Sequence, residues 1–386
     1  MSRLTLVACS LAAVFAVNAA DFQGQVNFEH RQFFSEGQQG QDKAQSSVVL
    51  MPEIYHAWDD YSVTFELFAR LDSLDSERSH WDVRELMVQY YANDVELNIG
   101  IGKVFWGVTE SQHLVDVINQ TDWVESVDGE QKLGQPMINL NWFTDCGNFQ
   151  AYVLPGFRER TFAGRDGRLG PYGINTDNAK YEASNEDQHV DVAFRYTQML
   201  GDWDIGLSIF HGTNRDPYLQ IENSELVPYY AQMTQIGADL QGIYGDWIYK
   251  LEAIHRDSND ETFRAMTAGF EYTQVGIFDS QYDLGWLAEY LYDSRDEEAP
   301  VSGQNDIFAG WRLALNDADS SEILFGISQD LDFSRSRSAR LEATSRLSNN
   351  WKWRVNAWLF ESDDAADSLY GFRDEDFVEL ALDYYF

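Results

Sequence analysis

Cysteine is scarce in this chain of 386 residues: there are two, Cys9 and Cys146. Cys9 lies in an N-terminal segment that we expect to be removed, which leaves Cys146 alone. A single cysteine excludes an intramolecular disulfide framework, and it excludes metal and redox motifs that need two cysteines. We therefore interpret Cys146 as a small turn residue.

Basic residues are also scarce, with 27 Lys and Arg against 64 Asp and Glu and a formal net charge of −37. Binding of DNA or RNA needs basic patches that neutralise phosphates, so nucleic-acid partners are excluded. Disordered chains can carry a similar acidic excess. An aromatic content of 15%, with 12 tryptophans, argues instead for a folded protein.

Long hydrophobic runs are missing after residue 20, where no stretch reaches the roughly 20 apolar residues of a transmembrane helix. Residues 1–20 combine Arg3, an apolar stretch and Ala19–Ala20, which is typical of a secretory signal peptide. The alternative is lipid attachment at Cys9, but the apolar stretch before it is too short. The mature chain, 21–386, would carry a net charge of −38, because Arg3 is lost. It fits a soluble periplasmic β protein or an outer-membrane barrel.

Catalytic signatures are absent as well: there is no Gly-x-Ser-x-Gly and no His-Glu-x-x-His. The seven histidines are scattered without metal-ligand spacing, and the acidic stretches lack the ordered spacing of a calcium site. We expect no enzyme, no metal site and no cofactor. A Ser/His pair assembled in space on the outer surface stays the enzymatic alternative.

What the sequence does contain is strict alternation of apolar and polar residues. In the C-terminal "FVELALDYYF", Val378, Leu380 and Leu382 share one face, while Glu379 and Asp383 share the other. A strand with one face in lipid and one in water requires this pattern. The charged face would be costly in a dry core but suits a wet lumen. The terminal Phe also resembles the C-terminal signature of bacterial outer-membrane barrels.

About eighteen segments alternate in this way, with sixteen as the alternative count. Short turns rich in Gly, Asn and Asp alternate with longer acidic connections, the topology of a transmembrane antiparallel β-barrel. Aromatic residues near the strand ends predict a periplasmic girdle. The segments lie near 21–34, 46–58, 61–72, 82–92, 94–104, 136–145, 148–158, 188–200, 203–213, 229–241, 246–256, 260–273, 280–293, 305–315, 321–332, 336–347, 350–361 and 374–386.

The alternation stops between residues 105 and 135, after the fifth segment. With a periplasmic N-terminus this connection is the third external loop, and in classical porins the third loop folds into the lumen and narrows the pore. We expect the same here. Gly107, after Trp106, permits a sharp turn, Thr109 and Gln112 form a potential capping box, and Leu114, Val117 and Ile118 predict a short helix ending at Asn119.

Charge predicts how such a loop would select solutes. Three loop acids would face the lumen, namely Glu110, Asp116 and Asp122. Inward-facing basic residues of the wall would oppose them, chiefly Arg195, Arg312, Arg340, Arg346 and Arg354. Opposed charges across a constriction form a selectivity device. The alternative is that the wall residues form salt bridges that stiffen the barrel without selecting anything.

A second motif opens the fourth external loop. "VLPGFRERTFAGRDGRLGP", residues 153–171, carries four arginines, Arg158, Arg160, Arg165 and Arg168. They predict docking on the third loop, with lipopolysaccharide phosphates or an anionic solute as alternatives. Residues 97–171 resemble motifs of a poorly characterised porin-like family of proteobacterial outer membranes, and this resemblance implies no substrate.

These observations predict a Gram-negative outer-membrane channel for passive diffusion of small polar or cationic solutes, with residues 105–135 as the constriction. The partners would be outer-membrane lipid, lipopolysaccharide and a small solute. A homotrimer stays open, because lipid-facing and subunit-facing apolar residues look alike. The alternative function is a plugged barrel that serves as a structural or docking component of an envelope export or assembly system.

Overall fold

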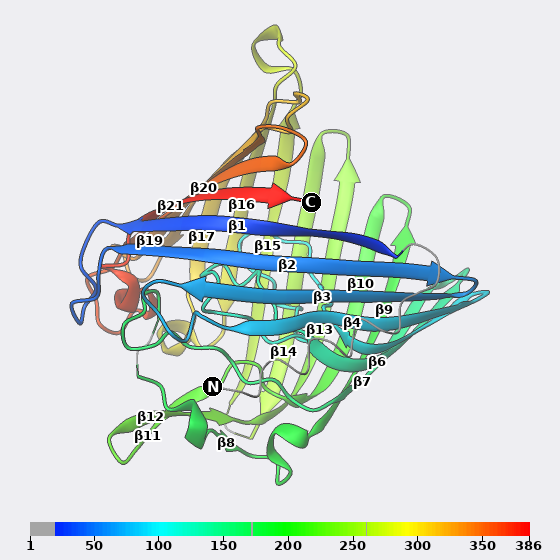
Figure 1. Ribbon diagram of the computed structural model, residues 1–386, viewed down its shortest axis with the longest axis horizontal. Helices are drawn as coiled ribbons and strands as arrows, with labels where there is room; N and C mark the ends of the chain where they lie inside the picture. The colour runs from blue at the N-terminus through cyan, green and yellow to red at the C-terminus, as the bar shows by residue number, and fades with distance from the viewer. Residues whose placement is uncertain (1–19, 171–172, 260) are drawn as a thin grey trace, which may run out of the picture.

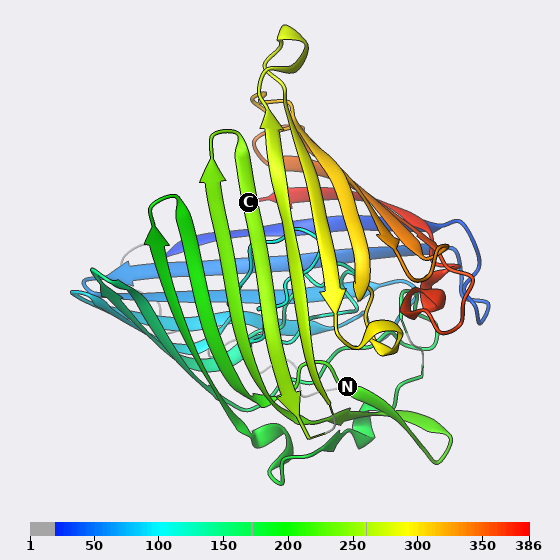
Figure 2. The same cartoon turned by 180° about the vertical axis from the view of Figure 1, so that it is seen from behind.

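The chain forms a closed antiparallel β-barrel of 18 strands, seen from opposite sides in Figures 1 and 2. The computed structural model describes residues 20–170, 173–259 and 261–386. Strand β1 (Asp21–Phe33) pairs with its successor β2 (Ala44–Trp58) and with the last strand β21 (Phe377–Tyr385), which closes the barrel. The predicted count of eighteen is confirmed and the alternative of sixteen is wrong. The predicted signal peptide lies outside the described residues, apart from Ala20.

The other barrel strands follow the predicted segments closely. They are β3 (Tyr61–Asp72), β4 (Trp81–Ala92), β5 (Val95–Gly102), β6 (Gln135–Thr144), β7 (Gly147–Pro155), β9 (Val190–Leu200), β10 (Trp203–Thr213), β13 (Gln232–Tyr244), β14 (Trp247–Ser258), β15 (Thr262–Gln274), β16 (Asp283–Asp293), β17 (Asn305–Ala314), β18 (Glu322–Asp330), β19 (Arg337–Arg346) and β20 (Trp351–Glu361). Each pairs with its barrel neighbours in antiparallel register.

The barrel is apolar outside and polar inside, the reverse of a water-soluble protein. On β6, Leu140 and Trp142 are 42% and 53% exposed, whereas their neighbours Asn139 and Asn141 are buried. Outward side chains of this kind are stable in lipid, and the polar interior is that of a water-filled or protein-filled lumen.

The two ends of the barrel differ in their connections. One end has mostly short turns, and in the two-residue turns that begin at Asp59, Asn93, Gly201 and Gly245 this first residue has a positive φ, as the tight turns of twisted hairpins require. In Figure 1 these turns lie at the right and the top, and the long loops lie at the left and the bottom. Aromatic pairs such as Trp247 and Tyr272, with ring centroids 4.7 Å apart, mark the short-turn end.

A small second sheet lies among the long loops and was not predicted. It contains β8 (Lys180–Tyr181), β11 (Tyr218–Glu222) and β12 (Glu225–Tyr230). The predicted segment 229–241 therefore begins too early, since Gln232 is the first residue of β13. The signal that sequence reasoning missed is Asn223–Ser224, which turns between β11 and β12 with positive φ at both residues.

The helices of the described residues are 3₁₀ segments of three to five residues. They are η1 (Thr176–Asn178), η2 (Glu186–Gln188), η3 (Ile277–Asp279), η4 (Asp296–Glu298) and η5 (Ser368–Phe372). Among the described residues, no helix is long and apolar enough to cross a membrane.

Candidate functional site: the loop inside the barrel

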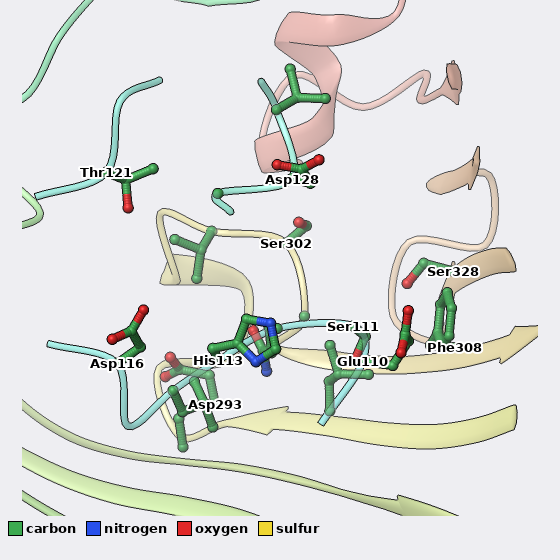
Figure 3. A pocket seen from close by; sticks show the side chains of 18 of the residues that line it. Glu110, Ser111, His113, Asp116, Thr121, Asp128, Asp293, Ser302, Phe308 and Ser328 are labelled. Atoms are coloured by element: carbon green, nitrogen blue, oxygen red, sulfur yellow. The ribbon is translucent and has the colours of Figure 1, made fainter. Parts of the chain in front are cut away.

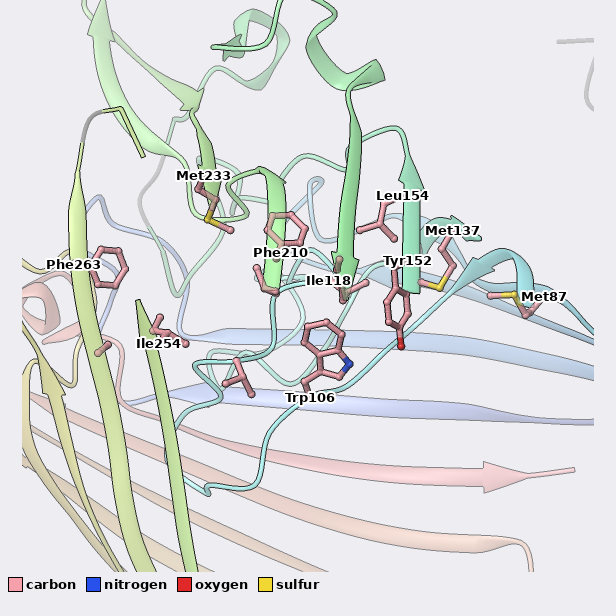
Figure 4. Packing of buried hydrophobic residues seen from close by; sticks show 14 residues of the cluster. Met87, Trp106, Ile118, Met137, Tyr152, Leu154, Phe210, Met233, Ile254 and Phe263 are labelled. Atoms are coloured by element: carbon pink, nitrogen blue, oxygen red, sulfur yellow. The ribbon is translucent and has the colours of Figure 1, made fainter. Parts of the chain in front are cut away.

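The connection between β5 and β6, residues 103–134, lies inside the barrel as predicted, and we call it the lumen loop. Its apolar residues Trp106, Val115 and Ile118 are buried against the inner wall. Figure 4 shows Trp106 and Ile118 among Phe210, Tyr152 and Ile254 of the wall strands. The indole of Trp106 meets the Tyr152 ring edge-on, with centroids 5.7 Å apart.

The predicted helix is wrong: no described residue of the lumen loop is helical. The Thr109 side chain is not a cap, because its hydroxyl contacts the carbonyl oxygen of Gln112 and a carboxylate oxygen of Glu252. The wall satisfies the backbone N–H groups that a helix would have used. Leu114, Val117 and Ile118 pack against the wall as their spacing predicts, but the backbone between them forms no α-helical hydrogen bonds.

Two buried carboxylates of the wall hold residues 107–115, which we call the tip. Glu252 of β14 accepts hydrogen bonds from the backbone of Val108, Thr109 and Val115 at 2.7, 3.0 and 3.2 Å. Glu289 of β16 accepts from the backbone of Glu110 and Ser111, both at 2.8 Å. Hydrogen bonds to an ionised acceptor are among the strong ones. The tip is therefore fixed to this side of the barrel.

Gly107 allows the tip to lie close to Glu252 of β14. Its φ of +144° lies in a region that L side chains rarely adopt. A Cβ at this position would also lie 2.9 Å from a carboxylate oxygen of Glu252 and 2.9 Å from Nδ1 of His113. A larger residue would therefore push the tip away from β14.

Glu110 at the tip joins two wall arginines. Its carboxylate lies 2.9 Å from Arg312 of β17 and 2.8 Å from Arg340 of β19. Arg312 also lies 3.2 Å from Glu322, and Arg340 lies 3.7 Å from Glu342. The loop acid and the wall bases are thus in direct contact, rather than facing one another across an open gap.

Residues 119–133, the return segment, lie against a different part of the wall. The Asn119 amide donates to the carbonyl oxygens of Gly102 and Leu133, both at 2.8 Å, and its oxygen accepts from the Val104 backbone at 2.9 Å. This buried side chain closes the base of the loop.

Asp122 and Glu125 of the return segment meet guanidinium groups. Asp122 is fully buried and lies 2.5 Å from Arg84 of β4 and 3.1 Å from His80. Burial favours the neutral acid, but the hydrogen bonds and charges of His80 and Arg84 outweigh it and hold the pKa of Asp122 at about 2. Glu125 lies 2.5 Å from Arg70 of β3.

His80, Asp122 and Glu125 bring potential metal-ligand atoms within 4.8 Å of one another. However, Asp122 already accepts a hydrogen bond from Arg84, and Glu125 already accepts one from Arg70. Adding a divalent cation would place it beside two buried positive charges. The cluster is therefore better explained as an anchor of the loop.

Asp116 and His113 have partners within the loop itself. Asp116 lies 3.1 Å from Lys132, and burial raises its pKa despite this lysine. His113 lies 2.9 Å from Glu130 and 3.8 Å from Glu252. Burial disfavours the charged imidazole, but these two acids outweigh it and raise the pKa of His113 to about 10. His113 is therefore a cation at neutral pH.

The remaining predicted wall residues lie apart from the loop acids. Arg195 pairs with Asp239 at 2.8 Å, and its guanidinium lies 5.0 Å from the Trp106 ring centroid. Arg354 pairs with Asp383 at 2.7 Å. Arg346 is exposed at the short-turn end of β19.

The four arginines of the second motif have different surroundings. Arg158 donates to the Gly134 carbonyl and to Asp82, each at 2.8 Å. Arg160 lies over the Trp123 ring of the lumen loop at 4.4 Å. Arg165 is exposed.

Arg168 reaches a different target: its Nε lies 2.8 Å from Glu375, in the loop before β21. Its guanidinium also donates to the carbonyl oxygens of Ser35 and Asp42 in the loop between β1 and β2. This fully buried arginine therefore ties the fourth loop to the first and the last, rather than to acids of the lumen loop.

Several anchors were missed by sequence reasoning, namely Arg31, Arg78, Arg84 and Glu252. Arg31 and Arg78 join the network around Glu29, Glu125 and Glu379. Arg84 instead pairs with Asp82 and Asp122. The signal was present for Arg84, since Asp82 and Arg84 alternate with Val83 in "WDVREL". What was missing is the pairing partner, which lies dozens of residues away in the chain.

A cavity of about 330 Å³ lies on the long-loop side of the tip. Figure 3 shows residues of the lumen loop, such as Glu110, His113 and Asp128, facing the same space as Asp293, Phe308 and Ser328. The cavity is thus bounded by the loop on one side and by strands β14 to β20 and their loops on the other.

No protein-family model and no curated protein matches this chain. Solved structures are similar in fold. A BenF-like porin from Pseudomonas fluorescens Pf-5 is 10% identical, with 95% of this chain and 97% of that chain covered and a TM-score of 0.54. Wzi, a carbohydrate-binding barrel involved in group 1 capsule assembly in Escherichia coli, is 9% identical, with 95% and 84% covered and a TM-score of 0.57. The chain therefore has the fold of a porin-like outer-membrane β-barrel.

Proposed function

We propose that the protein is an outer-membrane channel for small polar or cationic solutes, narrowed by residues 105–135. The observation that carries this proposal is the crossing of the lumen by the loop. Its tip is bonded to Glu252 and Glu289, and its return segment is bonded to Arg70 and Arg84. A loop fixed on both sides leaves only restricted passages beside it, which favours small solutes over bulk flow.

The excess of acid supports a weak preference for cations. The mature chain would carry a net charge of −38, and inward strand residues include Glu252, Glu271 and Glu289. The matching wall arginines are neutralised by acidic partners such as Glu110, Asp239 and Asp383. Cations would therefore be enriched in the lumen relative to anions.

Membrane residence is part of the same proposal. The apolar outer surface and the aromatic pairs at the short-turn end suit the outer membrane of a Gram-negative bacterium, reached after cleavage of residues 1–20. Exposed Arg165 among the long loops suits contact with lipopolysaccharide phosphates. The role proposed is non-enzymatic. A homotrimer remains a prediction, and chemical cross-linking in intact cells tests it.

Conductance in planar bilayers tests the channel. We expect the wild-type protein to give small single-channel steps with a reversal potential that favours potassium over chloride, and we expect deletion of 108–130 to enlarge the steps several-fold. The refolded deletion variant must first retain the β-rich circular dichroism of the wild type. If neither protein conducts, the channel proposal is wrong.

A closed barrel that serves envelope assembly is the second candidate. Extensive contact between the lumen loop and the wall favours this candidate. The similar fold of Wzi, a protein involved in capsule assembly, also supports it. The same recordings separate the two candidates. A silent wild type with a conducting deletion variant would indicate a sealed lumen and support the second candidate.

A further inference from the structure

The cavity on the long-loop side of the tip has a lining that is informative about ligand chemistry. Its volume of about 330 Å³ lies within the range of small-molecule sites. It is formed jointly by the lumen loop and the barrel wall, so that a solute entering from the long-loop end would meet it before the tip.

Most charged groups in this lining are already paired with an opposite charge. Arg295 lies 2.6 Å from Asp293, and Arg256 lies 3.2 Å from Asp216. Lys132, Arg340 and His113 are paired with Asp116, Glu110 and Glu130. A charged solute would have to compete with these pairs for a partner, whereas a neutral solute could use their remaining hydrogen-bonding capacity without breaking them.

Aromatic and hydroxyl groups complete the lining. Trp123 lies beneath Arg160, and Trp358 is stacked on Phe360 with ring centroids 5.8 Å apart and planes inclined by 9°. Both indoles are therefore held in place by neighbours. Hydroxyl groups from both the wall and the loop line the same space, namely those of Ser111, Thr121, Ser302, Ser328 and Ser338.

Asp128 adds an acceptor that has no salt bridge among the described residues. Its carboxylate accepts from the Glu130 backbone at 3.0 Å and lines the cavity. Fixed aromatic faces next to hydroxyls and carboxylates match a molecule that has both an apolar C–H face and a ring of hydroxyl groups.

We propose that this cavity binds a neutral saccharide of one or two rings. Trp123 and Trp358 would contact the apolar faces of the sugar rings, and the hydroxyl and carboxylate groups would bind the sugar hydroxyls. The inference rests on the proposed function, because it names the class of solute that enters the channel. It goes further in assigning a binding site on the long-loop side of the tip.

Isothermal titration calorimetry of the folded mature protein in detergent tests the site. The probes are maltose and three single-ring sugars of similar size that differ in charge: glucose, glucosamine and glucuronate. We expect saturable heats for glucose and maltose, and binding at least tenfold weaker for the two charged sugars. Equal or tighter binding of a charged sugar overturns the proposal, as does the absence of saturable heat with both neutral sugars.

Two tryptophan variants locate the site. W358L should weaken maltose binding at least tenfold. W286L is the matched control, because Trp286 is 47% exposed on the outer face of β16, and it should bind as the wild type does. Equal affinities of the two variants would contradict the assignment. Unchanged thermal unfolding of W358L establishes that the barrel is intact.

Comparing the conductance recordings with the sugar-binding results tests the saccharide site and the channel independently. A conducting channel that binds neither neutral sugar leaves the channel standing and removes the saccharide site. A silent barrel that binds maltose through Trp358 removes the channel and retains the site.

Discussion

The tip and the return segment belong to one loop, yet apart from the Glu110 bridge to Arg312 and Arg340 the barrel holds them by opposite chemistry. At the tip the wall supplies carboxylates, Glu252 and Glu289, and the loop supplies backbone N–H groups. At the return segment the wall supplies guanidinium groups, and the loop supplies the carboxylates of Asp122 and Glu125. The difference teaches which contacts can open, because breaking a buried ion pair leaves two uncompensated charges, whereas releasing backbone N–H groups from Glu252 or Glu289 leaves one.

The largest effect should follow from removal of a return-segment guanidinium. Arg84→Met leaves Asp122 buried with a weaker partner, and we expect a loss of about 3 kcal/mol in the free energy of unfolding. Denaturant unfolding followed by tryptophan fluorescence measures it. Arg335→Met is the control, because the Arg335–Asp363 pair is exposed and should contribute less than about 1 kcal/mol. Similar losses in both variants would contradict the comparison.

A smaller effect should follow at the tip. Glu252→Gln replaces an acceptor of several loop hydrogen bonds with an amide that is partly a donor. We expect this change to destabilise the attachment of the tip to the wall by about 1–3 kcal/mol. The loss should appear locally, as faster proteolytic cleavage between residues 107 and 115, with global unfolding less affected than by Arg84→Met. Glu361→Gln, at an exposed strand end paired with Arg337, is the control. Equal cleavage of both variants would argue against the wall carboxylate as the anchor.

The two segments should also loosen at opposite ends of the pH range. The pKa of Asp122 is lowered from 3.8 to about 2, so its contribution to stability is present above pH 4 and is lost as pH falls toward 2. The pKa of His113 is raised from 6.5 to about 10, so its contribution is present below pH 6.5 and is lost as pH rises toward 10.

Hydrogen exchange of the lumen loop, measured across pH and corrected for the intrinsic exchange rate, tests both windows. Loss of protection should begin at the return segment in acid and at the tip in alkali. His113→Gln should abolish the alkaline change and leave the acid change in place. Loss of protection in both segments at the same pH would mean that the loop moves as one unit.

The smallest effect concerns the bridge at Glu110. Glu110→Gln leaves Arg312 and Arg340 without this acid, but Glu322 and Glu342 remain close. We expect the single-channel conductance to change less than twofold, with a shift of the reversal potential toward anions. Glu361→Gln again provides the control. An unchanged reversal potential would show that this bridge does not contribute to selectivity.

The barrel could be predicted from sequence because its signals are local. Alternation within "FVELALDYYF" and turn residues such as Asn93 and Gly245 each specify a strand or a turn without reference to distant residues. The placement of the third loop inside the lumen followed from counting strands, and the structure confirms it.

The contacts of the loop could not be predicted, because they join residues far apart in the chain. Asp122 was predicted to face the lumen, yet its partner is Arg84, and Glu110 meets Arg340 across 230 positions. The helix prediction failed for a related reason. The spacing of Leu114, Val117 and Ile118 shows which side chains are buried, but the hydrogen-bonding partner of the backbone is Glu252, 137 residues beyond Val115.

The seam between β1 and β21 has a consequence for how the protein folds. Arg31 crosses the seam to Glu379, 348 residues away, and also donates to the Glu125 carbonyl of the lumen loop. Joining such distant residues carries the largest loop-closure entropy of the barrel, so we expect the seam to close last. The lumen loop supplies one of the acceptors of Arg31, so closure of the seam and placement of the loop stabilise each other. Arg31 thereby couples the final step of folding to correct placement of the loop.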